Sequence, residues 1–291
     1  MNDLAQVLSN SDSMLAASTR MGPMLVAKGK INPKDLSMIL AAQKKHGLRF
    51  GEAALKLGLI KDEDIKAILA EQFAYTQTPA ASSKLDRRLS ALFQPDSAQA
   101  EALRSLRSEL QLRYFNPQPH RALTLVSAED AAGSALTAAN LAISFAQLGL
   151  RTLLIDSNLR HPQLNALFDL PEHAPGLSDW IAERTSVAPT AIETVRCLSV
   201  LPAGTRAPNP QELLASKHFQ ARIETLTLRF DVTLISTAPL DSNRDAQLVA
   251  AQTGAALLLA RTHVTSTKAL TAITTRLREL GVRLVGASLQ G

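Results

Sequence analysis

The chain has 291 residues, of which 46% are apolar, and its formal net charge is +5. This apolar fraction excludes a wholly disordered protein, and the length is enough for two domains. Basic residues are interspersed with acidic ones, so no charge run suggests a nucleic-acid-binding tail. One cysteine excludes an intramolecular disulfide framework, and the six histidines show no metal-ligand spacing. We therefore expect a cytoplasmic protein without a metal site or a nucleic-acid partner.

A repeated segment follows residues 1–19, which we expect to be flexible. Residues 20–43 realign with residues 49–72 at an offset of 29. Each copy predicts two short helices joined by a glycine turn, and Asn32 with Pro33 is a typical start for the second helix of the first copy. In that helix Leu36, Ile39 and Leu40 are expected on one face. Residues 20–75 are therefore predicted to form a small all-helical domain.

Arginine and glutamine recur at matching places in the two copies, and such polar repetition suits a ligand that is itself two-fold. Each copy resembles the 24-residue motif of the cyclic-di-GMP-binding domain (MshEN type) found at the N-terminus of type II secretion and pilus-assembly ATPases. The position after each arginine departs from the usual leucine, being Met21 and Phe50. The resemblance implies that eight residues line a cyclic-di-GMP site: Arg20, Gly22, Gly29, Gln43, Arg49, Gly51, Gly58 and Gln72.

A polar, turn-rich stretch at 76–83 opens a predicted linker over 76–96, and an α/β domain is predicted for 97–291. Its first helix is expected over 97–112. Short, fully apolar strands then alternate with helices, which indicates a parallel sheet covered by helices on both faces. Strands are predicted at 122–127, 152–156, 198–201, 232–236, 255–260 and 284–287, and helices between them include 135–148 and 266–280.

The segment after the first of these strands, residues 127–142, reads SAEDAAGSALTAANLA. It resembles the phosphate-binding P-loop of bacterial tyrosine kinases and of the wider partition-type ATPases. Gly133 then matches the second glycine, whereas Ala131 stands at the first glycine, Ser134 at the lysine and Ala135 at the magnesium-holding Ser/Thr. In the second motif Asp156 matches the first acid and Asn158 replaces the second. Ser236 replaces the acid of the third motif.

These replacements remove the charge that phosphoryl transfer depends on, because lysine offsets phosphate charge and Ser/Thr and Asp hold Mg²⁺. The sequence therefore predicts weak binding of ATP and Mg²⁺ and names no catalytic residue. Arg151 and Arg160 are the nearby cations that could substitute for the lysine.

Two further segments resemble the exopolysaccharide chain-length-determinant kinases. Residues 201–216, LPAGTRAPNPQELLAS, match one of their conserved segments, and Glu101, Arg104 and Arg107 match their Glu-x-x-Arg-x-x-Arg ring-assembly motif. The resemblance covers residue 97 to the end and implies self-association and a membrane-bound polysaccharide chain-length or export protein as partner. Such a partner would recruit the chain to the inner membrane face. These kinases also carry a terminal tyrosine cluster, whereas the tyrosines here are Tyr75 and Tyr114.

The leading hypothesis is a cyclic-di-GMP-responsive regulator of exopolysaccharide biosynthesis or export, built on a tyrosine kinase fold without catalysis. One alternative is an active ATP-dependent tyrosine kinase that controls polysaccharide chain length. The other is a structural adaptor that binds neither ligand.

Overall fold

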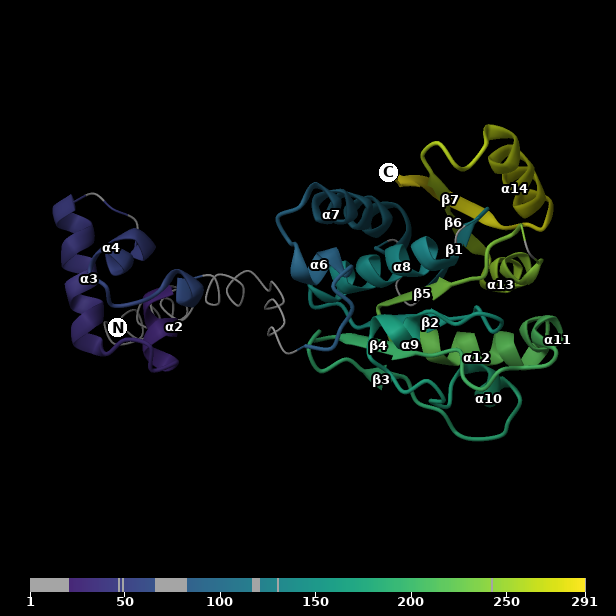
Figure 1. The fold of residues 1–291 in the computed structure, drawn as a ribbon, viewed down its shortest axis with the longest axis horizontal. Helices are drawn as coiled ribbons and strands as arrows, with labels where there is room; N and C mark the ends of the chain where they lie inside the picture. Colours follow the sequence, from purple (N-terminus) through teal and green to yellow (C-terminus); the bar gives the residue numbers. More distant parts are fainter. Residues whose placement is uncertain are drawn as a thin grey trace, which may run out of the picture. The chain divides into compact units, whose positions relative to one another are not determined.

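The computed structural model describes residues 21–46, 48, 50–65, 83–116, 121–129, 131–241 and 243–290. The chain forms two compact units, Met1–Gln77 and Thr78–Gly291 (Figure 1). Arg20, Arg49 and Gln72 of the predicted cyclic-di-GMP site lie outside the described residues, and so do Tyr75 and the predicted flexible segment 1–19. In the part of the chain that is described, no helix has the length and apolarity needed to span a membrane.

The first unit contains helices α2 (Met21–Ala27), α3 (Pro33–His46) and α4 (Phe50–Lys56). Asn32 caps α3 as predicted: its Oδ1 accepts from the backbone N–H groups of Lys34 and Asp35 at 2.9 Å, and Asp35 accepts from the Asn32 N–H at 2.9 Å. Gly29 and Gly58 follow α2 and α4 with the same φ of +65°. The local structure therefore repeats with the sequence.

The core of this unit repeats as well. Its buried residues are Leu25, Ile31, Ile39, Ala53, Ala54 and Ile60. Ile31 and Ile60 occupy matching positions of the two copies. Leu40, predicted to share the buried face of α3, is 48% exposed. That prediction was wrong, because Leu40 follows the fully buried Ile39 and neighbours in a helix point about 100° apart.

The second unit is built on a seven-stranded sheet in the order β3-β4-β2-β5-β1-β6-β7. All its pairings are parallel except that of the short edge strand β3 with β4. The predicted α/β class and the predicted strands are confirmed, and β3 is the strand that the sequence did not predict. The strands are β1 (Arg121–Ser127), β2 (Thr152–Asp156), β3 (Thr190–Ala191), β4 (Leu198–Leu201), β5 (Val232–Ser236), β6 (Ala255–Arg261) and β7 (Arg283–Gln290).

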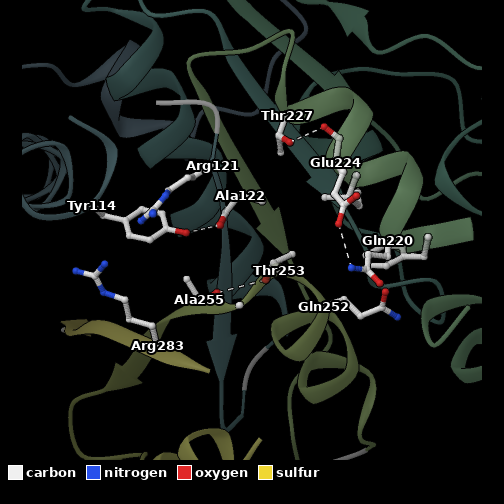
Figure 2. Close-up of a pocket in the computed structure, with 13 residues that line it drawn as sticks. Tyr114, Arg121, Ala122, Gln220, Glu224, Thr227, Gln252, Thr253, Ala255 and Arg283 are labelled. Atoms are coloured by element: carbon white, nitrogen blue, oxygen red, sulfur yellow. Dashed lines mark hydrogen bonds between the residues drawn. The ribbon is translucent and has the colours of Figure 1, made fainter. Parts of the chain in front are cut away.

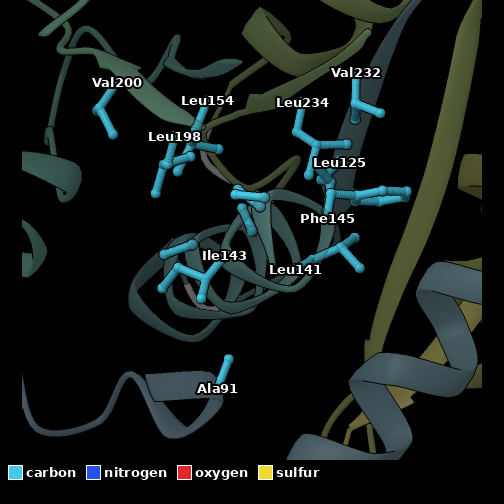
Figure 3. Close-up of a cluster of buried hydrophobic side chains, with 14 of the residues drawn as sticks. Ala91, Leu125, Leu141, Ile143, Phe145, Leu154, Leu198, Val200, Val232 and Leu234 are labelled. Carbon is cyan, nitrogen blue, oxygen red and sulfur yellow. The ribbon is translucent and has the colours of Figure 1, made fainter. Parts of the chain in front are cut away.

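Helices cover both faces of this sheet (Figure 1). Figure 3 shows α8 against one face, where Leu141 and Phe145 meet Leu125 of β1 and Leu234 of β5. Alternate strand residues such as Ile235 pack on the other face against α12. The helices of this unit are α6 (Ser90–Phe93), α7 (Ala98–Leu110), the short π-helix η1 (Gln111–Phe115), α8 (Ala131–Ala146), α9 (Leu164–Leu167), α10 (Leu177–Ile181), α11 (Pro210–Leu214), α12 (Lys217–Thr227), α13 (Asp245–Thr253) and α14 (Thr267–Glu279).

Residues 83–96, the second part of the predicted linker, contain helix α6 and contribute to the core of this unit. Leu85, Leu89 and Leu92 are buried against it. Asn140 of α8 is 1% exposed, and its Oδ1 accepts from the Ala91 N–H at 2.9 Å. The segment is therefore fixed to α8 by apolar packing and by a buried hydrogen bond.

Candidate functional site

The three sequence motifs meet at the carboxyl ends of β1, β2 and β5, which are neighbours in the sheet. Asp156 and Ser236 are paired in register at the last residues of β2 and β5. Ser127 ends β1, directly before the P-loop-like segment. This edge is where open α/β sheets place their ligands. The structure therefore brings the predicted nucleotide-site positions together.

The P-loop-like segment itself differs from the prediction. Helix α8 begins at Ala131, four residues before the predicted start, and β1 ends at Ser127, so three residues of the sequence separate the two elements. Gly133 therefore lies inside the first turn of the helix, with Ser134 5% and Ala135 3% exposed. The alanine-rich sequence favours helix at these positions, which explains the early start. A connection this short does not provide a loop that wraps around phosphates.

A carboxylate lies in this short connection. Oε2 of Glu129 accepts a hydrogen bond from Oγ1 of Thr265 at 2.9 Å. The backbone is held too, because Leu240 donates to the Ser127 carbonyl at 3.0 Å and Asp241 to the Ala128 carbonyl at 3.0 Å. An acidic residue just before a helix satisfies the positive end of the helix dipole, where a phosphate would otherwise bind. The sequence analysis missed Glu129, although an acid just ahead of a helix is a recognisable signal.

Asp156 has a structural role at this edge. It is 1% exposed, and its carboxylate accepts from the backbone N–H groups of Asn158 at 3.0 Å, Gln163 at 2.9 Å and Leu164 at 3.1 Å. Burial raises the pKa of Asp156, and the three N–H groups oppose that rise. The side chain therefore fixes the turn that follows β2.

The other two acid positions are also part of local structure. Oδ1 of Asn158 accepts from the His161 N–H at 3.1 Å. The Ser236 carbonyl accepts from both the N–H and the hydroxyl of Ser157, at 2.9 and 2.7 Å. The Ser157 bonds connect the ends of β2 and β5, the Asn158 bond holds the turn after β2, and neither residue supplies negative charge.

The two arginines that could substitute for the lysine both form ion pairs with aspartates of the fold. Arg160 pairs with the buried Asp245, Nε to Oδ2 at 2.8 Å. Arg151 pairs with Asp231 at 2.7 Å and precedes the first residue of β2, so it lies at the opposite end of the strand from Asp156. Arg151 therefore cannot reach the site, and Arg160 would leave a buried carboxylate unpaired if it moved.

ATP with Mg²⁺ is the ligand that the fold family implies, and these residues do not fit it. The lysine and Ser/Thr positions carry a neutral hydroxyl and a methyl group, Asp156 is occupied by backbone donors, and Glu129 adds a carboxylate two residues before the start of α8. Within the described ranges, no group of three or more His, Cys, Asp or Glu side chains is placed to hold a metal ion. We derive no phosphoryl-transfer step for this site.

The three residues of the predicted assembly motif lie on α7 but differ in their surroundings. Arg104 donates to Oε2 of Glu101 at 2.9 Å through Nε and to the Pro95 carbonyl at 2.8 Å. Arg107 donates to the Ser144 carbonyl of α8 at 3.2 Å. The Glu101 side chain is 66% exposed, against 23% for Arg104. Glu101 is therefore more exposed to solvent than its ion-pair partner Arg104.

Residues 201–216, the second segment that resembles the exopolysaccharide kinases, contact the start of α10. Oδ2 of Asp179 accepts from the N–H groups of Thr205 at 2.9 Å and Gly176 at 3.1 Å. Oγ of Ser178 donates to the Thr205 carbonyl at 2.6 Å. Gly204 has a φ of +87°, and a Cβ there would lie 2.5 Å from Oδ2 of Asp179. The motif thus requires glycine at 204 to let two segments approach closely.

In the first unit, the four glycines of the predicted ligand site have structural reasons to be glycine. A Cβ on Gly22 would lie 2.6 Å from Cδ1 of Leu36, and one on Gly51 would lie 3.1 Å from Cδ1 of Ile65. Gly29 and Gly58 have positive φ angles and open space around them. Gln43, half-buried, donates to the Leu48 carbonyl at 3.4 Å. A ligand role for these residues therefore stays a prediction.

No family model matches the chain, but the chain is similar to several bacterial tyrosine kinases in sequence and in structure. The chain is 36% identical over 158 residues to CapB of Staphylococcus aureus, named as a tyrosine-protein kinase, and the match covers 54% of this chain and 68% of that relative. It is 32% identical over 206 residues to the tyrosine-protein kinase wzc of Salmonella typhi, covering 69% of this chain but only 28% of that relative. The kinase domain of Escherichia coli tyrosine kinase ETK superposes with a TM-score of 0.67 at 26% identity, covering 72% of this chain and 81% of that chain.

Proposed function

The chain belongs to the bacterial tyrosine-protein kinases, and from this premise we propose that it keeps their fold as a regulatory scaffold and does not transfer phosphate. The observation that carries the proposal is the early start of α8. It removes the phosphate-wrapping loop and buries Ser134 and Ala135 in a helical turn. Losing even one positioned electrostatic group commonly lowers a catalysed rate by ~10²–10³.

The partners of the charged residues described near the site support the same proposal. Arg160 and Asp156 have partners within the fold, and Glu129 contributes the wrong sign of charge. We expect binding of ATP to be weak and nearly independent of Mg²⁺. Calorimetry of the full chain with ATP, with and without Mg²⁺, tests this: a clear gain in affinity on adding Mg²⁺ would contradict the proposal.

The input to this scaffold, in our proposal, is cyclic-di-GMP bound by the repeat unit. The support is the two-fold character of residues 20–72: the two copies share their core positions, their glycine turns at φ +65°, and their recurring Arg and Gln. Paired guanidinium groups suit a ligand with two phosphates and two flat bases, since guanidinium both forks onto phosphate and stacks on rings. One cyclic-di-GMP is expected per chain.

Calorimetry with cyclic-di-GMP tests this input on the full chain. Arg20→Ala and Arg49→Ala should each weaken binding by about 10- to 100-fold, because a hydrogen bond to a charged group typically contributes ~1.5–3 kcal/mol. Arg278→Ala is the matched control, since it removes an exposed arginine of α14 in the other unit. Absence of saturable heat with the wild type would contradict cyclic-di-GMP binding, but it would not affect the proposal that the chain does not transfer phosphate.

The output, in the same proposal, is control of exopolysaccharide biosynthesis or export in the cytoplasm, through a membrane-bound chain-length or export protein. It rests on the resemblance of residues 97–291 to the exopolysaccharide kinases. Self-association through the flank of α7 is part of it, supported by the exposed carboxylate of Glu101. Co-purification of the full chain with a membrane polysaccharide protein from the same operon or locus tests the partner, and Glu101→Arg should weaken it if assembly is required.

A further inference from the structure

A pocket lies at the amino ends of the strands, the end of the sheet away from the P-loop-like segment; Figure 2 shows the residues that line it. Its volume is about 390 Å³, within the ~300–1,000 Å³ typical of small-molecule sites. Arg121, Ala122, Ala255 and Arg283, which line it, lie at the amino ends of β1, β6 and β7. The remaining wall comes mainly from α12 and the end of α13. None of the sequence motifs falls in this pocket.

One wall of the pocket carries two arginines on a fixed aromatic ring. The guanidinium carbons of Arg121 and Arg283 lie 5.2 and 5.8 Å from the centroid of the Tyr114 ring, and Figure 2 shows both side chains beside it. Tyr114 is 3% exposed, and its hydroxyl donates to the Ala122 carbonyl at 2.8 Å. The ring is therefore held rigidly, and stacking on it leaves the N–H groups at the guanidinium edges able to bind a ligand.

The charge of these arginines is not neutralised locally. Among the residues that the structure describes, neither Arg121 nor Arg283 forms an ion pair with a carboxylate, and Arg283 donates to the Arg113 carbonyl at 3.4 Å. Glu109, the acid nearby on α7, pairs with Arg113 at 2.7 Å. Two like charges beside one ring repel each other, and an anion bound at this wall would remove that repulsion.

The wall that faces the two arginines carries a carboxylate and amide groups instead of positive charge. Gln220 of α12 donates to Oε1 of Glu224 at 3.0 Å, and Gln252 of α13 donates to the Leu214 carbonyl at 2.6 Å. Carboxylate and amide oxygens accept hydrogen bonds from hydroxyl groups, whereas the Glu224 charge repels phosphate. We propose that this pocket binds a phosphorylated sugar, with its phosphate on Arg121 and Arg283 and its hydroxyls toward Glu224 and Gln252.

Calorimetry of the full chain with glucose 1-phosphate, inorganic phosphate and glucose tests the proposal. Glucose 1-phosphate should saturate one site per chain, inorganic phosphate should bind more weakly, and glucose should show no saturation over the same range. Arg121→Gln/Arg283→Gln should weaken glucose 1-phosphate binding at least tenfold, while the matched control Arg278→Gln leaves it unchanged. Absence of saturation in the wild type, or equal affinity in the double variant, would overturn the proposal.

Glu224→Ala separates recognition from folding, because Glu224 is exposed and its loss leaves the arginine wall intact. Glucose 1-phosphate should bind at least fivefold more weakly to this variant, whereas inorganic phosphate should bind equally or more tightly. A general loss of stability would lower both affinities together. If the affinities for glucose 1-phosphate and inorganic phosphate both stay unchanged, Glu224 does not bind the sugar hydroxyls. The proposal that the ligand is a phosphorylated sugar is then wrong.

Discussion

Replacing Gly204 by alanine perturbs a close approach between two segments of the α/β unit, residues 176–179 and Gly204. A Cβ at this position would lie 2.5 Å from Oδ2 of Asp179, 2.7 Å from Oγ of Ser178 and 2.8 Å from the Gly176 nitrogen. Those neighbours must move, which weakens the hydrogen bonds that Asp179 accepts from Gly176 and Thr205 and the one that Ser178 donates. The variant therefore gains backbone strain and loses packing and hydrogen bonding.

The magnitude follows from these contributions. A non-glycine residue at positive φ costs about 1–2 kcal/mol. Two to three weakened hydrogen bonds cost about 1 kcal/mol each. We expect Gly204→Ala to lower the free energy of unfolding by about 3–5 kcal/mol. Gly281→Ala is the matched control, because Gly281 also has a positive φ, +75°, but a Cβ there meets nothing within 4 Å. The control should cost about 1–2 kcal/mol.

Urea unfolding of the full chain, followed by tryptophan fluorescence, measures both variants. Trp180 is the one tryptophan of the sequence, and it lies on α10 next to Asp179. Its signal therefore reports on the segment that Gly204 contacts. Equal losses in the two variants would refute the reasoning, because the difference between them is the close approach alone.

Three further changes give distinct results. Burial raises the pKa of Asp179, but hydrogen bonds from Thr205 and from the Gly176 N–H, together with the charge of Arg184, lower it more, so the pKa lies below its usual value. The ionised carboxylate therefore stabilises the fold above about pH 4, and this stabilisation is lost as pH falls through the lowered pKa. The stability deficit of Asp179→Asn, measured by urea unfolding, should shrink between pH 7 and pH 3. Asn140→Leu leaves the Ala91 N–H unpaired in the core and should cost about 1–3 kcal/mol by the same measurement, and an unchanged stability would contradict the role of this bond. Glu101→Arg should reduce self-association in light scattering without lowering the melting temperature, whereas a monomeric wild type at high concentration would remove α7 as an assembly surface.

The fold of the α/β unit was predictable because its strands are short, wholly apolar runs that periodicity identifies without tertiary information. Strand β3 could not be predicted, because its two residues, Thr190 and Ala191, are both exposed and show no hydrophobic periodicity. Leu85, Leu89 and Leu92 do follow helical spacing, but they stand among polar residues in a stretch that begins as a linker. Their contribution to the core is apparent only from the tertiary structure, in which they belong to the same buried cluster as residues of α8.

The sequence predicted which residues replace the family's site residues, and this assignment stays a prediction, whereas their contacts could not be predicted from the sequence. The sequence identified Ser134, Ala135 and Ser236 as losses. The family pattern also suggested a loop up to residue 134, whereas the helix propensity of alanine extends α8 back to Ala131. The bond from Thr265 to Glu129 joins residues 136 positions apart, and no local pattern specifies such a pairing.

If the kinase fold remains without phosphoryl transfer, the full chain should release no phosphate from Mg-ATP above background. The wild-type chain is compared with Ser134→Ala, which removes the hydroxyl at the lysine position and keeps a residue that favours helix. The account predicts background release in both and no phosphotyrosine on Tyr114, whose hydroxyl is bound to the Ala122 carbonyl in the core. Mg²⁺-dependent release by the wild type that falls in Ser134→Ala would contradict it.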